Sequence, residues 1–332
     1  MKDLLCLGVE TSCDETAAAV LRQDGHLLGS VVASQIDLHE AFGGVVPEVA
    51  ARRHLERIGP VVREALEQAG ADYGDIGLVA VTRGPGLAGA LMVGLSWAKA
   101  FAFARHVPLI GVNHVVAHAH AAYLEAEPSY PDLALVASGG HTDLLLLEGP
   151  TKVRVLGRSR DDAAGESFDK VARSLGLGYP GGPAIERIAG GGDAARAPLP
   201  RVGMFQGSLD FSFSGLKTAA QALRRQGLAP EDIAAAFQAA VFDQLWERAA
   251  LALRQTGCSR LIFAGGVSAN GYLRRRLDTA LRREGRSLLV PPMDHTTDNA
   301  AMIARLGLTM YEAGLESTWD MGAEPVIHPF KP

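Results

Sequence analysis

The chain is poor in cysteine and aromatic residues and carries little net charge, and each shortage excludes a class of protein. Its 3 cysteines, none in a Cys-x-x-Cys pair, cannot build a disulfide framework or an all-cysteine zinc site. A net charge of −5 disfavours nonspecific coating of nucleic acid, and 6% aromatic residues disfavour recognition by base stacking. With 48% hydrophobic residues in 332, the chain is not disordered. The cysteine content fits a reduced compartment, and we expect the cytoplasm.

Several familiar sequence patterns are also missing. Residues 1–10 lack the long apolar region and small-residue cleavage site of a signal peptide. The most apolar stretch, residues 87–104, contains three polar or glycine interruptions and a lysine, so we expect a buried helix and no membrane contact. There is no Gly-x-x-x-x-Gly-Lys-Ser/Thr pattern, and no Gly-x-Gly-x-x-Gly follows the first predicted strand. These absences exclude a P-loop NTPase and disfavour a dinucleotide-binding fold.

Strand and helix patterns alternate through both halves of the chain and predict an α/β fold. Short apolar runs bounded by turn residues predict strands at residues 4–10, 16–21, 26–34, 78–82, 108–112, 133–137, 142–147 and 261–264. Runs with helical spacing predict helices at residues 47–69, 87–104, 168–174, 215–225, 230–255, 269–283 and 298–313.

Two patterns occur once in each half. A strand, a small polar turn, a threonine and a second strand follow one another at residues 8–20 and again at residues 136–147. A strand, a glycine-rich loop and a helix occur at residues 79–93 and 262–277. We therefore expect two duplicated lobes, residues 1–128 and 129–332, with the option that the C-terminal segment crosses back to the first lobe. Ligands commonly bind between two lobes, so we expect the site in a cleft there.

A pair of histidines four residues apart gives the sharpest chemical signal. His114 and His118 would project from one face of a helix, which is the spacing that one metal ion needs from two helical ligands. His120 would point elsewhere and is a poor third ligand. The alternative is a pair of partly buried histidines that bond to backbone carbonyls.

Asp298, at the start of the last predicted helix, also has two interpretations. It could be the N-cap of that helix. Alternatively, it could complete, with His114 and His118, a two-histidine, one-carboxylate set that leaves metal positions open for water or ligand. Such a set suits Fe(II) or Zn(II), and spacing alone does not choose between them.

Turns rich in glycine or small polar residues lie at four element boundaries, residues 11–16, 138–142, 179–183 and 265–270. Consecutive glycines allow backbone N–H groups to approach an anion, and helix N-termini favour phosphate. Each turn by itself is ordinary, but the four together favour a nucleotide held between two lobes.

Charged residues leave further alternatives open. Asp169 lies deeper in a predicted helix than a cap would, and it could accept hydrogen bonds from ligand hydroxyls. Glu186 could do the same or face solvent. The arginines at residues 274–276, 282 and 283 are typical of a solvated helix face, although they are also compatible with contact to an RNA backbone.

Taken together, these motifs resemble the TsaD family, the tRNA threonylcarbamoyladenosine transferases once labelled O-sialoglycoprotein endopeptidases. They follow in family order from residue 8 to residue 299, so the set is specific although no single motif is. The matching motifs are residues 8–16 (Gly-Val-Glu-Thr-Ser-Cys-Asp-Glu-Thr), His114-x-x-x-His118, residues 138–142 (Ser-Gly-Gly-His-Thr), Asp169, residues 180–183 (Pro-Gly-Gly-Pro), residues 265–270 (Gly-Gly-Val-Ser-Ala-Asn) and residues 297–299 (Thr-Asp-Asn).

The resemblance implies a fold of two duplicated lobes of the actin/Hsp70/sugar-kinase-like (ASKHA) type. It implies an acyltransferase that moves a threonylcarbamoyl group from threonylcarbamoyl-AMP to N6 of adenosine 37 in tRNAs that read codons beginning with A. Relatives of the bacterial type work with a catalytically inactive paralogue (TsaB-like) and a small ATPase (TsaE-like).

The resemblance also implies site residues. His114, His118 and Asp298 would bind one divalent metal ion, most often Fe(2+), with Zn(2+) as the alternative. The residues implied to contact the substrate are Ala137, Ser138, Gly139, Gly140, His141, Asp169, Gly182, Glu186 and Asn270. Family members vary at the position of Glu186. We assign no catalytic base.

Three rival functions remain. A metallopeptidase would need a glutamate after the first histidine, where this chain has Val115. An ATP-dependent kinase or ATPase of the same fold is the main alternative, because a fold does not fix a function. The third rival is a non-enzymatic assembly subunit, which would be expected to lose the three metal-binding residues.

Overall fold

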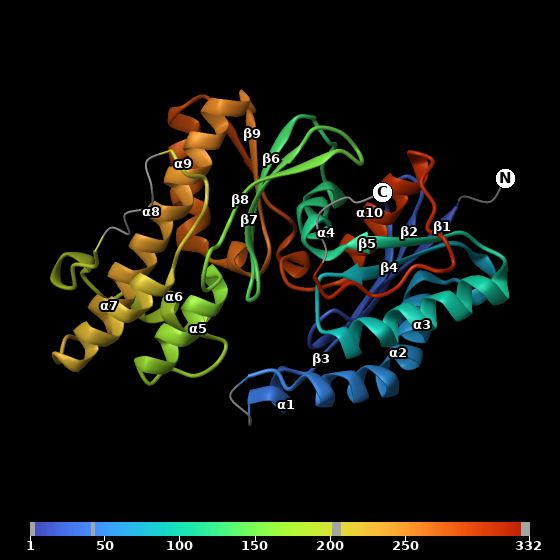
Figure 1. Cartoon of the computed structure of the whole chain (residues 1–332), viewed down its shortest axis with the longest axis horizontal. Coiled ribbons are helices and arrows are strands. Elements are labelled where there is room, and N and C mark those ends of the chain that lie inside the picture. The colour runs from blue at the N-terminus through green and yellow to red at the C-terminus, as the bar shows by residue number, and fades with distance from the viewer. Residues whose placement is uncertain (1–3, 41–43, 201–206, 327–332) are drawn as a thin grey trace. The chain divides into compact units, whose positions relative to one another are not determined.

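The computed structural model describes residues 4–40, 44–200 and 207–326 (Figure 1). The chain divides into two compact units. Unit 1 consists of Met1–Pro128, Gly149–Lys152 and Pro291–Pro332, and unit 2 consists of Ser129–Glu148 and Val153–Val290. The C-terminal segment therefore belongs with the N-terminal part of the chain.

The sheet of unit 1 has the strand order β3-β2-β1-β4-β5. Its strands are β1 (Leu5–Glu10), β2 (Glu15–Arg22), β3 (Leu27–Ser34), β4 (Ile76–Gly84) and β5 (Leu109–Asn113). The first three strands are antiparallel neighbours, whereas β4 runs parallel to β1 and β5 runs parallel to β4. The carboxyl ends of β1, β4 and β5 therefore lie at one edge of the sheet.

The sheet of unit 2 repeats this topology strand for strand. Its strands are β6 (Asp132–Ala137), β7 (Thr142–Leu147), β8 (Val153–Arg158), β9 (Arg260–Ala264) and β10 (Ser287–Leu289). They lie in the order β8-β7-β6-β9-β10, with an antiparallel β6-β7-β8 meander and with β9 and β10 parallel to β6. The predicted duplication is thus confirmed.

Helices cover both faces of the unit 1 sheet (Figure 1). The helices of unit 1 are α1 (Ile36–Glu40), α2 (Pro47–Ala69), α3 (Ala88–Arg105), α4 (His114–His120) and α10 (Ala300–Glu312). Helices α2 and α3 pack on one face, and α10 packs with α4 on the other. Side chains of β2 alternate accordingly, because Ala18 and Val20 join the core beside α2 and α3 while Ala17 and Ala19 contact α10.

Helix α10 lies so close to its sheet that only glycine fits at two contact points. A Cβ atom at Gly8 of β1 would lie 2.3 Å from the carbonyl oxygen of Ala300. A Cβ atom at Gly307 of α10 would lie 2.3 Å from Cβ of Ala80 in β4. These contacts fix α10 on β1 and β4, and with it the residues that precede its first turn.

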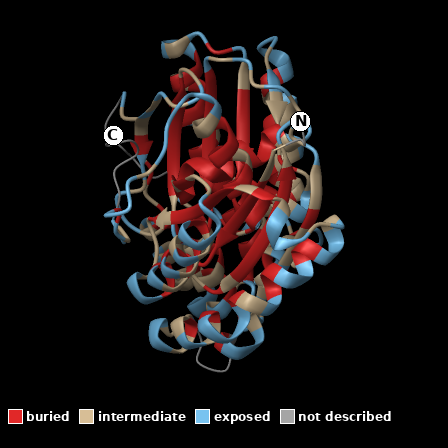
Figure 2. Ribbon diagram, turned by 90° about the vertical axis from the view of Figure 1, so that its right-hand side faces the viewer, coloured by how far each residue is buried: buried red, intermediate tan, exposed pale blue. Residues whose placement is uncertain are grey.

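The helices of unit 2 pack around one core with its sheet. They are α5 (Ala164–Ser174), α6 (Gly181–Ala189), α7 (Ser214–Arg225), α8 (Pro230–Thr256) and α9 (Gly271–Arg283). Phe168 and Phe237 meet edge to face in this core, with ring centroids 5.1 Å apart. In both units the central strands are buried, while helices such as α2, α3, α7 and α9 keep an exposed side (Figure 2).

The predicted strands and helices are present, with small shifts at their ends. The structure adds β8, β10, α1, α6 and short 3-10 helices at Tyr73–Asp75, Ala121–Leu124, Ala194–Arg196, Gly266–Ala269 and Met293–His295. The apolar stretch at residues 87–104 forms α3. Among the described residues, no helix combines the length and apolar character needed to cross a membrane.

Candidate functional site

Helix α4 carries the two histidines of the candidate site. Asn113 ends β5 and caps α4, because its side-chain oxygen accepts a hydrogen bond from the Val116 N–H at 3.1 Å. His114 is therefore the first helical residue, and His118 follows one turn later on the same face. Both side chains are buried, and their rings meet edge to face with centroids 4.7 Å apart.

His120 does not join this pair. Its Nδ1 atom bonds to the carbonyl oxygen of Val116 at 3.0 Å, and its ring contacts the ring of Tyr123. Burial lowers the pKa of His120 to about 4, so the imidazole is neutral at pH 7. The alternative in which a histidine bonds to a backbone carbonyl thus applies to His120, which is no third ligand.

Asp298 reaches both histidines although it lies far from them in the sequence. One carboxylate oxygen, Oδ1, lies 3.5 Å from Nε2 of His114 and 3.2 Å from Nε2 of His118. The three candidate ligand atoms all lie within 4.8 Å of one another. The close seating of α10 on β1 and its packing against α4 place Asp298 there.

Asp298 is not the N-cap of α10, so that interpretation is wrong. The cap is Asn299, whose Oδ1 accepts a hydrogen bond from the Met302 N–H at 3.0 Å. The amide nitrogen of Asn299 also donates to the carbonyl oxygen of Thr297 at 2.8 Å. Asn299 satisfies the helix end, and the carboxylate of Asp298 is left to face the histidines.

A buried glutamate to which the sequence analysis gave no role lies behind His114. Glu10 ends β1, and its Oε2 atom accepts hydrogen bonds from Nδ1 of His114 at 3.0 Å and from the hydroxyl of Thr82 at 2.6 Å. Its other oxygen accepts a hydrogen bond from the Ser12 N–H. The available signal was a glutamate at the end of one apolar strand and a threonine near the end of another.

The charges of these groups favour a cation among them. Burial raises the pKa of Asp298, but the charge of His114, followed by the close contacts with His114 and His118, holds it well below its ordinary value. Burial lowers the pKa of His114, yet the charges of Asp298 and Glu10 raise it well above its ordinary value. Burial, followed by the charge of Asp298, raises the pKa of Glu15 to about 10. A bound cation would offset this concentration of negative charge.

The three residues therefore form a site that could hold a metal ion. Neither ring nitrogen of the buried His118 has a hydrogen-bond partner among the described residues, although a buried polar atom normally has one. Its Nε2 atom is close to Asp298. Two imidazole nitrogens and one carboxylate oxygen are ligands that suit Fe(II) and Zn(II). The donor set and the unpartnered nitrogen both fit a divalent metal.

The equivalent edge of the unit 2 sheet carries the glycine turn between β6 and β7. The Ser138 N–H donates to the carbonyl oxygen of His141 at 2.8 Å, and the hydroxyl of Ser138 accepts from the His141 N–H at 3.1 Å. A Cβ atom at Gly139 or Gly140 would meet nothing within 4 Å, and both glycines are exposed. Ala137, which precedes the turn, is buried. The backbone N–H groups of the glycines are therefore accessible to a ligand.

Asp169 and Gly182 lie together at the start of α6. Asp169 accepts a hydrogen bond from the Gly181 N–H at 2.8 Å, so this carboxylate of α5 caps the neighbouring helix rather than its own. Burial raises the pKa of Asp169. A Cβ atom at Gly182 would meet nothing within 4 Å.

Glu186 and Asn270 meet at the start of α9. One oxygen of Glu186 accepts hydrogen bonds from the N–H groups of Gly271 at 2.8 Å and Tyr272 at 3.2 Å, so its carboxylate does not simply face solvent. Asn270 caps α9 through the Leu273 N–H at 2.9 Å and donates to Gln238 at 2.9 Å. The role of these residues in substrate binding stays a prediction.

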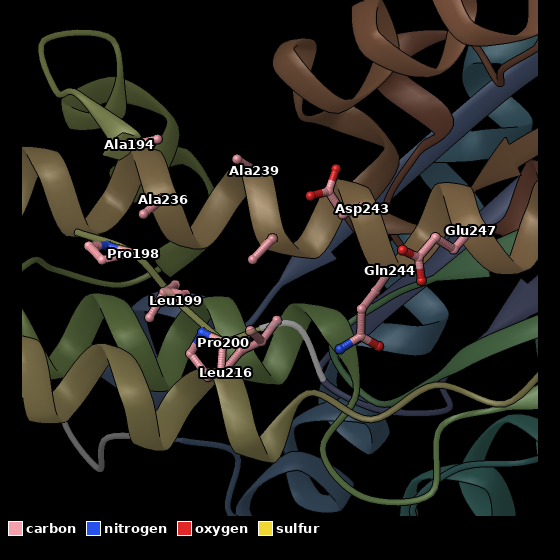
Figure 3. A pocket seen from close by; sticks show the side chains of 11 residues that line it. Ala194, Pro198, Leu199, Pro200, Leu216, Ala236, Ala239, Asp243, Gln244 and Glu247 are labelled. Atoms are coloured by element: carbon pink, nitrogen blue, oxygen red, sulfur yellow. The ribbon is translucent and has the colours of Figure 1, made fainter. Parts of the chain in front are cut away.

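A separate groove in unit 2 contains none of the predicted site residues. It has a volume of about 220 Å³ and lies along α8, beside α7 and the segment that follows Ala194 (Figure 3). Its walls combine small apolar side chains with Asp243, Gln244 and Glu247. The groove is thus distinct from the loops described above.

Comparison with known proteins identifies the family. The model of the TsaD family, described as tRNA N6-adenosine threonylcarbamoyltransferase, matches residues 26–305. A protein of that name from Symbiobacterium thermophilum is 53% identical over 327 residues, which cover 97% of this chain and 96% of that protein. Another from Bacillus subtilis is 46% identical over 331 residues, 98% of this chain and 95% of that protein. The chain belongs to the TsaD family.

Membership of the TsaD family makes the chain an acyltransferase of tRNA modification, with tRNA as the substrate that the family implies. The kinase or ATPase alternative is not favoured by these relatives. The expectations of a transferase and of the TsaD family are therefore confirmed.

Solved structures of low sequence identity agree with the predicted ASKHA type of fold. Full-length HypF in its phosphate- and nucleotide-bound form has a TM-score of 0.63 at 14% identity, over 94% of this chain and 56% of that chain. Component A of Acidaminococcus fermentans (R)-2-hydroxyglutaryl-CoA dehydratase has a TM-score of 0.55 at 15% identity, over 94% of this chain and all of that chain. At these identities the likeness concerns the fold alone.

Proposed function

We propose that this TsaD-family chain transfers the threonylcarbamoyl group of threonylcarbamoyl-AMP to N6 of adenosine 37 in tRNAs that read codons beginning with A. The observation that carries the proposal is the convergence of His114, His118 and Asp298 within 4.8 Å in a chain of this family. A kinase of the same fold would not require this buried set of ligands.

His114, His118 and Asp298 would hold one divalent metal ion, Fe(2+) in preference to Zn(2+). Two neutral imidazoles and one carboxylate leave open coordination positions, which iron(II) sites of this kind use for exogenous ligands. When bound, the ion would supply Lewis-acid polarisation of the donor's acyl or phosphate oxygen. The chain itself supplies Nε2 of His114, Nε2 of His118 and Oδ1 of Asp298. The packing of α4 and α10 fixes the positions of these atoms.

The unit 2 residues Ala137 to His141, with Asp169, Gly182, Glu186 and Asn270, would bind the adenylate. The N–H groups of Gly139 and Gly140 are suited to phosphate oxygens, because no side chain shields them. Asp169 and Glu186 each have one carboxylate oxygen that accepts a hydrogen bond from a backbone N–H group. These carboxylates would also accept hydrogen bonds from ribose hydroxyls. Orientation of donor and acceptor would supply much of the acceleration. We assign no general base, because an amine that attacks an activated acyl group needs little help from the enzyme in losing its proton.

The proposed partners are a TsaB-like inactive paralogue and a TsaE-like small ATPase, as the family resemblance implies. Because the substrate is tRNA, we propose that the reaction takes place in the cytoplasm. Both assignments rest on the family and not on a contact surface of this chain.

Reconstitution tests the proposed reaction. The chain would be incubated with labelled threonine, bicarbonate, ATP, tRNA, the enzyme that forms the adenylate and the two partner proteins. We expect label at adenosine 37, measured by nucleoside mass spectrometry, and none in a matched tRNA with guanosine at that position. Failure to modify the adenosine with all components present would refute the transferase assignment.

A further inference from the structure

Glu10 is a buried carboxylate that is saturated with hydrogen-bond donors. The residue is 0% exposed. His114, Thr82 and the Ser12 N–H all donate to it. A charge removed from water is costly unless such donors compensate it, and here three do. The same donors leave the carboxylate in a single orientation.

The carboxylate determines which nitrogen of His114 carries the proton. An ionised carboxylate only accepts hydrogen bonds, so the contact of 3.0 Å with Glu10 requires a hydrogen on Nδ1 of His114. Its Nε2 atom, which lies 3.5 Å from Oδ1 of Asp298, is then the nitrogen that would give up its proton and present its lone pair to a metal ion. Metal-binding histidines commonly donate the N–H of their other nitrogen in this way.

The duplicated sheet of unit 2 shows that the fold does not need a carboxylate here. The strand pairs β1–β4 and β6–β9 correspond through Val9 with Val81 and Val136 with Ala264. The residues that follow are Glu10 and Thr82 in unit 1 but Ala137 and Gly265 in unit 2. The equivalent strand ends of unit 2 therefore form without a buried charge.

Only one of the two histidines has such support. Nδ1 of His118 has no hydrogen-bond partner among the described residues, whereas Nδ1 of His114 faces Glu10 and also lies 3.2 Å from the hydroxyl of Ser12. The orientation of His114 is therefore fixed from behind before any metal binds.

We propose that Glu10 is a positioning residue for the metal: it holds His114 in the tautomer and orientation that present Nε2 to the ion. Thr82 and the Ser12 N–H hold Glu10 in turn. This inference rests on the proposed function, which assigns a metal to His114, His118 and Asp298.

The test is zinc affinity of the full chain with Glu10→Gln, measured by competition with a chelator. We expect the zinc Kd to rise by about 10-fold to 100-fold, the loss typical of a removed partner behind a metal-binding histidine. Glu324→Gln is the matched control. Glu324 pairs with Arg83 elsewhere in unit 1, and the zinc Kd should stay at the wild-type value.

A tautomer readout separates positioning from a purely structural role. Long-range 1H–15N spectra of the zinc-loaded, 15N-histidine-labelled chain should show His114 protonated at Nδ1 in the wild type. They should show a mixed or altered state in Glu10→Gln. If Glu10→Gln does not fold, Glu10→Asp is the second variant. Its shorter side chain reaches His114 less well, so zinc binding should weaken. An unchanged zinc Kd and an unchanged Nδ1 proton in a folded Glu10 variant would overturn the role of Glu10 but leave the metal assignment intact. A wild type that binds neither zinc nor iron would overturn the metal assignment as well.

Discussion

The turns β1–β2 and β6–β7 occupy the same place in the two duplicated sheets, but one consists of buried polar residues and the other of exposed glycines. In unit 1, Thr11 and Ser12 are almost wholly buried, and the Thr11 hydroxyl donates to the carbonyl oxygen of Ala90 at 2.9 Å. In unit 2, Gly139 and Gly140 are exposed and have open space where side chains would be. One turn is held by its side chains, and the other leaves its backbone free.

If the unit 1 edge holds a metal ion and the unit 2 edge a phosphate, as proposed, one topology supports two kinds of binding. Side-chain ligands such as imidazoles must be held in place by further side chains, so the unit 1 edge is packed and charged. Backbone N–H groups bind anions only when nothing covers them, so the unit 2 edge is bare. Duplication supplied the same strand ends twice, and the residues at those ends decide the chemistry.

The largest expected effect is the loss of metal when one side-chain ligand is removed from the packed edge. In His118→Ala we expect no stoichiometric iron or zinc, because two ligands hold a divalent ion far less tightly than three. Metal content by plasma mass spectrometry measures this, and circular dichroism checks that the fold is kept. His26→Ala, at an exposed position, is the control and should keep its metal. Retained metal in His118→Ala would mean that the ligand set is wrong.

The packing that brings Asp298 to the histidines gives the next effect. Gly8→Ala would place a Cβ atom 2.3 Å from the carbonyl oxygen of Ala300 and force α10 away from β1. We expect the free energy of unfolding to fall by about 3 kcal/mol, the upper part of the range for overpacking. The zinc Kd should rise as well, because Asp298 moves with α10. Chemical denaturation and zinc titration measure the two effects.

A matched control for Gly8→Ala is Gly74→Ala. Gly74 lies in the 3-10 helix Tyr73–Asp75, and its added methyl group would make only an ordinary contact, 3.7 Å from the Arg105 side chain. Alanine there should leave the zinc Kd unchanged and change the free energy of unfolding by less than about 0.5 kcal/mol. If Gly8→Ala also kept both stability and zinc affinity, the close approach of α10 would not position the site.

One buried ionisable group from each unit, His120 and Asp143, should respond to pH in opposite directions. Burial lowers the pKa of His120 in unit 1 to about 4, so between pH 4 and 6.5 the unfolded chain binds more protons and stability rises with pH. Burial raises the pKa of Asp143 in unit 2 to about 6, so between pH 3.8 and 6 the native chain binds more protons and stability falls with pH. Each effect is about 3 kcal/mol at its limit.

Denaturation curves across pH 3.5 to 7 for the wild type, His120→Gln and Asp143→Asn measure these slopes. His120→Gln should remove the rise and leave the fall, and Asp143→Asn should do the reverse. Identical pH profiles for the wild type and both variants would contradict the assigned environments.

The elements of the fold could largely be predicted from the sequence because they are local. Pro47 opens α2 and Gly70, with a φ of 62°, ends it, and both residues signal these ends in the sequence. The strands β8 and β10 were missed. β8 carries arginines between its apolar residues, and β10 has only three residues, Ser287–Leu289.

The site could be predicted only in part because its contacts are long-range. The four-residue spacing of His114 and His118 is a local signal. Asp298 and Asn299 are adjacent, and both residue types commonly cap helices, so the local sequence does not show which of them caps α10. Tertiary packing decides that Asn299 is the cap. Glu10 meets His114 across 104 positions of sequence, a contact that follows from the parallel strands and not from any spacing.

The smallest expected effect concerns the bare edge and tests it most directly. In Gly139→Ala with Gly140→Ala, the added methyl groups meet no atom within 4 Å, so the free energy of unfolding should change by less than about 0.5 kcal/mol. The methyl groups nevertheless occupy the approach to the backbone N–H groups. We therefore expect kcat/KM for threonylcarbamoyl-AMP to fall about tenfold, equivalent to about 1.4 kcal/mol. Gly322→Ala, in unit 1 and equally open, should change neither quantity. Unchanged kinetics in the double variant would show that the glycine turn does not bind the substrate.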